Sequence, residues 1–492
     1  MTNFIKLLCI ACMLILNITS SFAQNQTNYW YFGNKAGLNF NFSSPKVWNN
    51  SQMNTYGGGT TVSDSLGKLL FYTNGRTVWN NKHWIIGKGI QTTTASNSCR
   101  VLRLPNKPLQ YYIFSLHSPR EQRGYSFYWS QLDLTANQGK GKLIAKNQLI
   151  HSRRFFGGIT TILHANGQDS WVVVHDTTNT FYSYLFTKKG LQPNPIKSTV
   201  GKVIPPKKST ILSFFGSLKS SPDGRRLAKL YYHEEVEIFD FNPSNGTISN
   251  ARVLKGDRGT RFQYMEFSPS GQKIYASAIG DLSKYKADIL YQFDLINPNR
   301  PLKTVINKPG EVPYIGGIQL AKNGKIYVNQ AGYLGVIEYP ERPGKLCDYN
   351  PKGISLKGRK TRSGLPTFPA HYFRPTDKIG VGTPFKRNIE FTSGQAIIQP
   401  QYYKLIDDIA EFLKKNPKTS IHITGHTDNM GQPKSNLILS KKRAQAVAKY
   451  LNQKGIKADR IETTGEGSKS PIANNQTPKG RKKNRRIEFF IK

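Results

Sequence analysis

The residues of this sequence that could most directly bind a charged ligand are one carboxylate and one guanidinium in its C-terminal part. Asp428 closes the segment Gly425-His426-Thr427-Asp428, directly after a predicted strand, and Arg443 lies inside the helix predicted to follow. Asn436 and Ser440 recur with Arg443 at helical spacing, so the three side chains share one face. That face packs on the sheet, and an arginine there needs an anion nearby because an unpaired buried charge is costly.

Spacing alone leaves two interpretations of this group open. In the first, Asp428 accepts the ammonium group of a zwitterionic ligand and Arg443 binds its carboxylate in a two-pronged pair. Asn436 and Thr427 then complete the hydrogen bonds. In the second, Arg443 forms a structural ion pair with Asp428 or Glu488, and no ligand is involved.

The elements that must position these residues alternate between strand and helix from residue 386 to residue 492. Apolar residues recur at helical spacing in two segments, and the second predicted helix ends at Gly455. The predicted order is β-α-β-α-β-β, an α+β domain with a mixed sheet under two helices. Its predicted strands are 387–391, 420–424, 460–465 and 485–491, and its predicted helices are 401–415 and 434–453.

The predicted last strand carries a second group of polar residues. Arg486 and Glu488 face one side of the sheet, whereas Arg485 faces the other. We expect Asn484 and Arg486 to support the sheet and helices rather than to contact a ligand.

With these motifs in place, residues 386–492 resemble the OmpA-like C-terminal peptidoglycan-binding domain. The resemblance implies that Asp428 and Arg443 hold the diaminopimelate of the cell-wall stem peptide. Peptidoglycan is therefore the expected partner of this domain. The matching positions span the domain and include Phe391-Thr392-Ser393-Gly394, Gly425-His426-Thr427-Asp428, Asn436, Leu439-Ser440, Arg443-Ala444, Gly465-Glu466-Gly467 and Asn484-Arg485-Arg486.

Residues 24–370 have a different pattern, in which a turn containing glycine repeatedly precedes an apolar or aromatic strand. Periods near those of blade repeats predict an all-β propeller of six or seven blades, because a lone four-stranded blade cannot bury both of its faces. A β-sandwich is the alternative. We expect a degenerate copy of the turn at 104–107, and the clear copies contain Gly67, Gly167, Gly224, Gly271 and Gly324.

This N-terminal region is similar to the exported WD-like propellers common in the Bacteroidetes. The likeness rests on Trp30-Tyr31-Phe32-Gly33, on Leu69-Leu70-Phe71-Tyr72 and on Gly364-Leu365-Pro366. It implies a platform that binds other envelope proteins. Residues 371–385 are predicted to be the linker between the two domains.

Composition and the N-terminus bound the cellular setting. Residues 1–23 have the pattern of a cleavable signal peptide, with small residues before the expected cleavage site and an apolar core too short to span a membrane. The formal net charge of +41 favours polyanionic partners. Export argues against nucleic acid as that partner. Cys99 and Cys347 remain after cleavage, either as a disulfide or as two buried thiols.

No nucleophile-elbow, zinc-protease or phosphate-loop motif occurs in the sequence. His422 and His426 share a face but have no evident third ligand, so neither a metal nor another cofactor is expected. The prediction is a non-enzymatic periplasmic protein, associated with the outer membrane or a secretion assembly. Two alternatives are a propeller that hydrolyses wall polymers and a surface adhesin that binds polyanions through its charge.

Overall fold

The computed structural model describes most of the chain. The residues described are 24–42, 44–93, 99–118, 125–155, 157–203, 216–231, 235–279, 288–295, 302–307, 314–374, 389–417 and 419–491. The predicted signal peptide, 1–23, lies outside them, as does most of the predicted linker. Of that linker, the short 3-10 helix η5 (Ala370–Phe373) and Arg374 are described.

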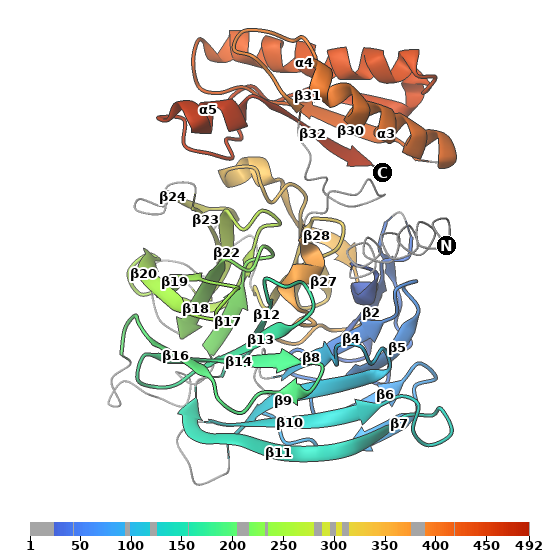
Figure 1. Ribbon diagram of the computed structural model, residues 1–492, viewed down its shortest axis with the longest axis vertical. Helices are drawn as coiled ribbons and strands as arrows, with labels where there is room; N and C mark the ends of the chain where they lie inside the picture. Colours follow the sequence, from blue (N-terminus) through green and yellow to red (C-terminus); the bar gives the residue numbers. More distant parts are fainter. Residues whose placement is uncertain are drawn as a thin grey trace, which may run out of the picture.

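The N-terminal part is built from antiparallel sheets, each made of strands that follow one another in sequence (Figure 1). The described residues form seven such sheets. The first three are β1 (Tyr29–Phe32), β2 (Ala36–Asn39) and β3 (Lys46–Val47); β4 (Thr60–Ser63), β5 (Leu69–Thr73), β6 (Thr77–Asn80) and β7 (Ile85–Lys88); and β8 (Cys99–Arg103), β9 (Gln110–His117), β10 (Tyr125–Asp133) and β11 (Lys142–Phe155).

The remaining four sheets continue the same pattern along the chain. They are β12 (Thr160–Leu163), β13 (Ser170–His175), β14 (Thr180–Thr187), β15 (Gly190–Leu191) and β16 (Ile196–Thr199); β17 (Gly216–Ser220), β18 (Arg226–Tyr231), β19 (Glu235–Phe241) and β20 (Ile248–Lys255); β21 (Arg261–Phe267), β22 (Lys273–Ile279), β23 (Ile289–Asp294) and β24 (Leu302–Val305); and β25 (Ile318–Leu320), β26 (Ile326–Gln330), β27 (Tyr333–Ile337) and β28 (Tyr349–Ser355).

The repeated turn seen in the sequence occupies the same place in six of these sheets, between the first and second strands. Five of the turns use a glycine with positive φ, for example Gly224 at 73° and Gly271 at 71°. The predicted degenerate copy lies between β8 and β9, where Asn106 takes the left-handed conformation with φ of 63°. Glycine and asparagine tolerate that conformation best, which explains why the turn is recognisable in the sequence.

The two ends of the N-terminal part pack together. Trp30 of β1 lies against Tyr327 of β26, with ring centroids 5.4 Å apart, in one continuous apolar cluster. The backbone nitrogen of Asn34 donates to the carbonyl of Lys360 over 2.9 Å. The first and last sheets therefore share a core, and the N-terminal part is a multi-sheet β structure.

The C-terminal domain is a mixed four-stranded sheet under two helices. The sheet order is β29-β32-β30-β31, with β30 and β31 parallel and the other pairs antiparallel. Its elements are β29 (Ile389–Glu390), the 3-10 turn η6 (Pro400–Tyr402), α3 (Tyr403–Lys415), β30 (Ile421–Gly425), α4 (Pro433–Gln453), the 3-10 turn η7 (Ala458–Arg460), β31 (Ile461–Gly465), α5 (Pro478–Asn484) and β32 (Arg486–Ile491).

The apolar faces of both helices form the core of this domain. Ile406 and Ile409 of α3 and Val447 and Leu451 of α4 are fully buried on the sheet. The packing of α4 is close, because a Cβ added to Gly425 would lie 1.9 Å from the carbonyl oxygen of Ser440. The expected strand and helix order is present, with one difference.

That difference is the short helix α5, which the predicted order does not contain. Pro478 occupies its first turn, and the side chain of Thr477 accepts a hydrogen bond from the backbone nitrogen of Gly480. The pattern of a capping threonine followed by proline favours a helix start. The helix is short and mostly basic, so its sequence contains no apolar periodicity from which a helix could be predicted.

The two cysteines that follow the predicted signal peptide are both buried free thiols in separate clusters: Cys99 beside β9 and Cys347 beside β26 and β27.

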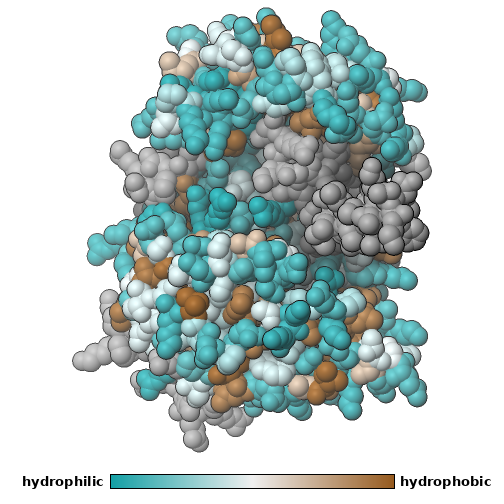
Figure 2. All heavy atoms as spheres, viewed as in Figure 1, coloured by the Kyte–Doolittle hydropathy of each residue, from teal (hydrophilic) through white to brown (hydrophobic). Residues whose placement is uncertain are grey.

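Hydrophilic residues cover most of the face seen in Figure 2. The C-terminal domain lies over the N-terminal part near β24 and β28 (Figure 1), and Arg342 pairs with Glu466 between them at 2.9 Å. Within the described residues, no helix is long and apolar enough to span a membrane.

Candidate functional site

The candidate site lies where β30 ends and α4 begins. The loop between them contains Thr427 and Asp428, which are 3% and 5% exposed. The backbone nitrogen of His426 donates to the carbonyl of Arg486 (2.8 Å), and that of Thr427 donates to the carbonyl of Gly467 (2.9 Å). The loop is thus fixed to β32 on one side and to the segment after β31 on the other.

Asp428 forms an ion pair, but its partner is Arg485. Nη1 of Arg485 donates to Oδ2 of Asp428 over 2.7 Å, while the backbone nitrogen of Met430 donates to Oδ1 over 3.2 Å. The Arg485 side chain is 17% exposed. Sequence reasoning missed this role, because strand alternation placed Arg485 on the face opposite Arg486 and said nothing of how far its side chain reaches.

Arg443 is fully buried and bonds to backbone carbonyls. Its Nε donates to Gln395 O (2.8 Å), its Nη1 to His426 O (3.0 Å) and its Nη2 to Thr392 O (3.0 Å). The structural ion pairs considered from spacing, with Asp428 or Glu488, are therefore not the contacts that Arg443 makes. Three carbonyl oxygens satisfy the buried guanidinium instead.

The two arginines together hold the segment after β29. Nε of Arg485 donates to the carbonyl of Phe391 over 3.1 Å, next to the carbonyl of Thr392 that Arg443 binds. The guanidinium carbon of Arg443 also lies 5.0 Å from the centroid of the Phe391 ring, a favourable cation–π contact. Asp428 thus lies beside the guanidinium groups of Arg443 and Arg485, and both of these arginines bind carbonyls of the segment after β29.

Burial disfavours the charged form of Arg443, and nearby Arg485 disfavours it further, while Asp428 opposes both effects. The net result lowers the pKa of Arg443 to about 10. The side chain is still a cation at neutral pH. Of its five N–H groups, three bind the carbonyls named above, so two remain for another acceptor.

Asn436 and Thr427 line the same loop. Nδ2 of Asn436 donates to the carbonyl of Met430 over 3.0 Å and to that of Asp428 over 3.4 Å, so this side chain shapes the loop around the carboxylate. Oγ1 of Thr427 is buried and has no hydrogen-bond partner among the described residues. A buried hydroxyl without a partner is uncommon, and a ligand or water would satisfy it.

Asn484 and Arg486 bind the backbone on the other side of β32. Oδ1 of Asn484 accepts from the nitrogens of Ile472 and Ala473 at 2.8 and 2.9 Å. Arg486 donates through Nε to Glu488 over 2.7 Å and through Nη2 to the carbonyl of Ser470 over 3.1 Å. These contacts hold the segment between β31 and α5 against the sheet.

The two histidines singled out in the sequence lie on that same side. His422 is hydrogen-bonded to Thr464 at 2.8 Å, and Nε2 of His426 lies 3.5 Å from Glu488. Burial, followed by the charge of Arg486, lowers the pKa of His426. Across the ranges that the structure describes, no group of three or more His, Cys, Asp or Glu side chains is arranged to hold a metal ion.

The fold and this loop define a small α+β domain with a charged site at the end of a central strand. Residues 390–485 match the model of the OmpA family. The chain belongs to the OmpA family through this C-terminal domain. The rest of the chain lies outside the matched residues.

Known relatives align with the same domain. Peptidoglycan-binding protein ArfA of Mycobacterium bovis is 43% identical over 103 residues, which are 21% of this chain and 32% of ArfA. The chain thus spans about a third of the length of ArfA. The peptidoglycan-associated lipoprotein of Buchnera aphidicola is 34% identical over 128 residues, 26% of this chain and 72% of the lipoprotein. The crystal structure of the peptidoglycan-associated lipoprotein from Burkholderia pseudomallei is 32% identical, covers 22% of this chain and 91% of that chain, and has a TM-score of 0.21.

Proposed function

We propose that the C-terminal domain binds peptidoglycan without covalent chemistry, through the diaminopimelate of the stem peptide. The observation that carries the proposal is Asp428, a nearly buried carboxylate held beside two guanidinium groups in the loop before α4. Such a group of charges is complementary to a ligand end that carries both an ammonium and a carboxylate. The names of ArfA and of the Buchnera lipoprotein support peptidoglycan as the partner.

In this proposal the ligand ammonium binds Asp428 and takes the place that Arg485 occupies. Arg485 then turns its guanidinium to the ligand carboxylate, because its side chain is the more exposed of the two arginines. Arg443 contributes its positive charge and offers its two remaining N–H groups to the ligand. Thr427 and Asn436 complete the hydrogen bonds, with Oγ1 of Thr427 gaining the partner that it lacks.

We also propose that the N-terminal sheets form a seven-bladed propeller that serves as a platform for envelope proteins, in the periplasm and associated with the outer membrane. The seven consecutive sheets, five of them four-stranded, and the shared core of the first and last sheets support this arrangement. In this proposal the chain is not an enzyme. Its partners at the platform are proteins, and the wall is bound by the C-terminal domain.

The alternative, a wall-polymer hydrolase, would need two carboxylates free to act as acid and base. Two of the deeply buried N-terminal carboxylates are paired with lysines, whereas a third, Asp176, accepts hydrogen bonds from Thr178 and Tyr182. Glu266 of β21 binds Lys219 of β17 at 2.7 Å, and Glu237 of β19 binds Lys229 of β18 at 2.7 Å. These pairings favour the non-enzymatic proposal.

The test is binding of the mature protein to purified peptidoglycan sacculi at low and high salt. The key variant is Asp428→Asn, which keeps the shape of the side chain and removes its charge. We expect it to weaken binding by roughly tenfold to a hundredfold, the value of about 1.5–3 kcal/mol for a hydrogen bond to a charged group. Asp459→Asn, an exposed carboxylate of the same domain, is the matched control.

The salt series separates a specific site from bulk attraction. Exposed charges are screened at high salt, whereas a nearly buried pair is screened much less. Binding that persists in salt and is lost in Asp428→Asn supports the proposal. Binding that disappears in salt, or that is equal in the two variants, would leave the net charge of +41 as its cause and overturn the site.

A further inference from the structure

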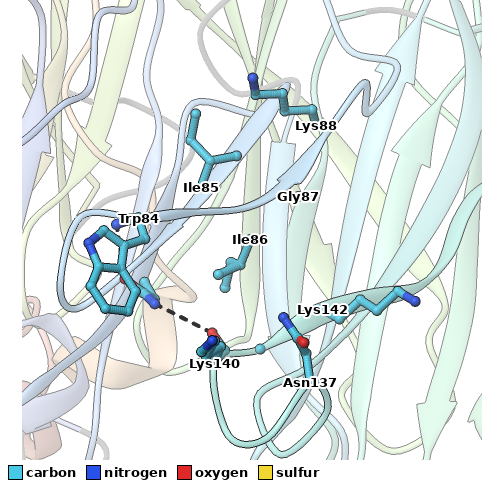
Figure 3. Close-up of a pocket in the computed structure, with 10 residues that line it drawn as sticks. Trp84, Ile85, Ile86, Gly87, Lys88, Asn137, Lys140 and Lys142 are labelled. Carbon is cyan, nitrogen blue, oxygen red and sulfur yellow. Dashed lines mark hydrogen bonds between the residues drawn. The ribbon is translucent and has the colours of Figure 1, made fainter.

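A groove on the surface of the described residues lies between the second and third sheets, far from the C-terminal domain in sequence (Figure 3). It has a volume of about 390 Å³. Strand β7 and the residue before it form one wall, from Trp84 to Lys88. The turn that leads into β11, residues 137–142, forms the other wall. In Figure 3 the side chain of Ile86 extends from the first wall toward the second.

The walls of this groove combine exposed apolar side chains with cations. Trp84 is 54% exposed and Ile85 is 48% exposed, so two large apolar side chains are open to solvent here. Lys88, Lys140 and Lys142 border them and are all exposed, and no carboxylate among the described residues pairs with any of the three. The lining contains no Asp or Glu, so the groove is apolar at its centre and positive at its rim.

A fourth lysine adds to the positive charge. Nζ of Lys82 lies 5.1 Å from the centroid of the Trp84 ring, a cation–π contact that holds the indole at the mouth of the groove. Asn80 fixes the opposite wall, with its Nδ2 donating to the carbonyl of Lys140 over 3.4 Å. The groove is therefore built by contacts between two neighbouring sheets.

Strand β7 is also the last strand of its sheet, paired only with β6 among the described residues. An extended peptide can add to such an edge through its backbone, while pockets beside the edge accept its side chains. Lysines on an edge strand can serve only to deter unwanted pairing. That explanation also covers Lys142, because β11 is the edge strand of its own sheet, but Lys140 lies in the turn before β11, where it does not apply.

We propose that this groove binds an extended acidic segment of a protein partner, with an apolar side chain against Trp84 and Ile86 and carboxylates on the surrounding lysines. Charge complementarity argues for the acidic character. An acidic polysaccharide fits less well, because its hydroxyl groups need many hydrogen-bonding partners. Of the two amide side chains in the lining, Asn80 already binds backbone groups through both its amide atoms.

This inference deepens the proposed role of the N-terminal sheets as a protein platform and rests on that part of the proposed function alone. The probe is a short fluorescein-labelled peptide of alternating valine and glutamate, measured by fluorescence anisotropy with the full mature protein at physiological salt. A peptide with glutamine in place of glutamate tests the need for charge. Sodium polygalacturonate, added as a competitor, tests an acidic glycan.

The groove variants are Trp84→Ala and the double substitution Lys140→Glu with Lys142→Glu. We expect each to weaken peptide binding by about tenfold or more. The matched control is Lys197→Glu with Lys352→Glu, two exposed lysines on β16 and β28 that change the net charge by the same amount. All substituted side chains are exposed, and thermal unfolding checks that each variant is folded.

Binding that is lost in both groove variants, kept in the control and absent for the glutamine peptide supports the inference. An equal loss in the control would overturn it in favour of bulk charge. Binding that no variant changes would overturn the groove but leave a platform elsewhere, and binding only of polygalacturonate would overturn the peptide as occupant. Sacculi binding should be unchanged in every groove variant, which separates this result from the test of Asp428.

Discussion

Nη1 of Arg485 lies 2.7 Å from Oδ2 of Asp428, in the place where an incoming ammonium group would have to bind. The carboxylate of Asp428 therefore already has a cationic partner within the protein. Arg485 holds it in place, and in the proposed function binding is an exchange of one cation for another. Such an exchange costs less than burying a carboxylate without any partner, because a lone buried charge is strongly unfavourable.

Substitution of Arg485 tests whether its side chain binds the ligand or only competes with the ligand for Asp428. We expect Arg485→Ala to weaken sacculi binding by about tenfold, because the loss of a charge-assisted hydrogen bond to the ligand carboxylate outweighs the release of Asp428. Binding assays at several salt concentrations measure this change. Lys483→Ala, an exposed cation of the neighbouring helix α5, is the control. Tighter binding by Arg485→Ala would mean that Arg485 only competes with the ligand.

Arg443 is expected to matter for stability as much as for binding. Arg443→Ala would leave the carbonyls of Thr392, Gln395 and His426 without their donor. Each unsatisfied buried group costs about 1–3 kcal/mol, so we expect the free energy of unfolding of this domain to fall by about 3 kcal/mol or more.

Hydrogen exchange of the full chain, read at β30 and α4, measures the stability of this domain separately from the N-terminal part. Arg443→Lys should recover only part of the loss, because an ammonium group cannot reproduce the planar fork of donors. Unchanged protection in Arg443→Ala would show that the carbonyls find other partners. A loss of sacculi binding in this variant is informative only where the domain is still folded.

The sequence predicted the C-terminal domain well because its signals are local. The helical spacing of Ile406 and Ile409 in one helix, and of Val447 and Leu451 in the other, reports directly which faces are buried. The loop position of Asp428 and the inward face of Arg443 follow from the same periodicity. The partners of the two charges did not follow, because the reach of Arg485 from β32 depends on the order of strands in the sheet.

The repeat of the N-terminal part was predictable from the sequence, but the contact between its two ends was not. The turns around Gly167, Gly224, Gly271 and Gly324 are visible because positive φ restricts the residue type. The contact of Trp30 with Tyr327 joins residues at opposite ends of this part, and no local pattern announces such a contact. The groove at Trp84 and Lys140 was missed for the same reason, since its two walls come from different sheets.

Gly425 is predicted to be essential for the packing of α4 on the sheet. A methyl group at this position would lie 1.9 Å from the carbonyl oxygen of Ser440, so the helix would have to move. We expect Gly425→Ala to lower the stability of the domain by about 1–3 kcal/mol, the usual cost of overpacking. Hydrogen exchange at α4 measures it. Gly332→Ala, where an added Cβ meets no atom within 4 Å, should be neutral.

The stability of the C-terminal domain should fall with decreasing pH in two steps, and the first belongs to His426. Burial and the charge of Arg486 lower its pKa in the folded state. In the unfolded chain the imidazole returns to its ordinary pKa of about 6.5. As the pH falls through that value, the unfolded chain takes up a proton that the folded domain resists, so acid favours unfolding.

Glu488 is expected to produce the second step, at lower pH. Burial alone would raise its pKa, but the charges of Arg486 and His426 outweigh burial and hold the pKa below the usual range of a glutamate. Its stabilising contribution is present above that usual range and is lost as the pH falls toward the folded value. Hydrogen exchange at β30 and β32 between pH 7 and pH 2 measures both steps. His426→Gln should flatten the first step and reduce the second, because the charge of His426 helps to lower the pKa of Glu488. His164→Gln, on a turn of the N-terminal part, should change neither. An unchanged first step in His426→Gln would assign the acid sensitivity to another group.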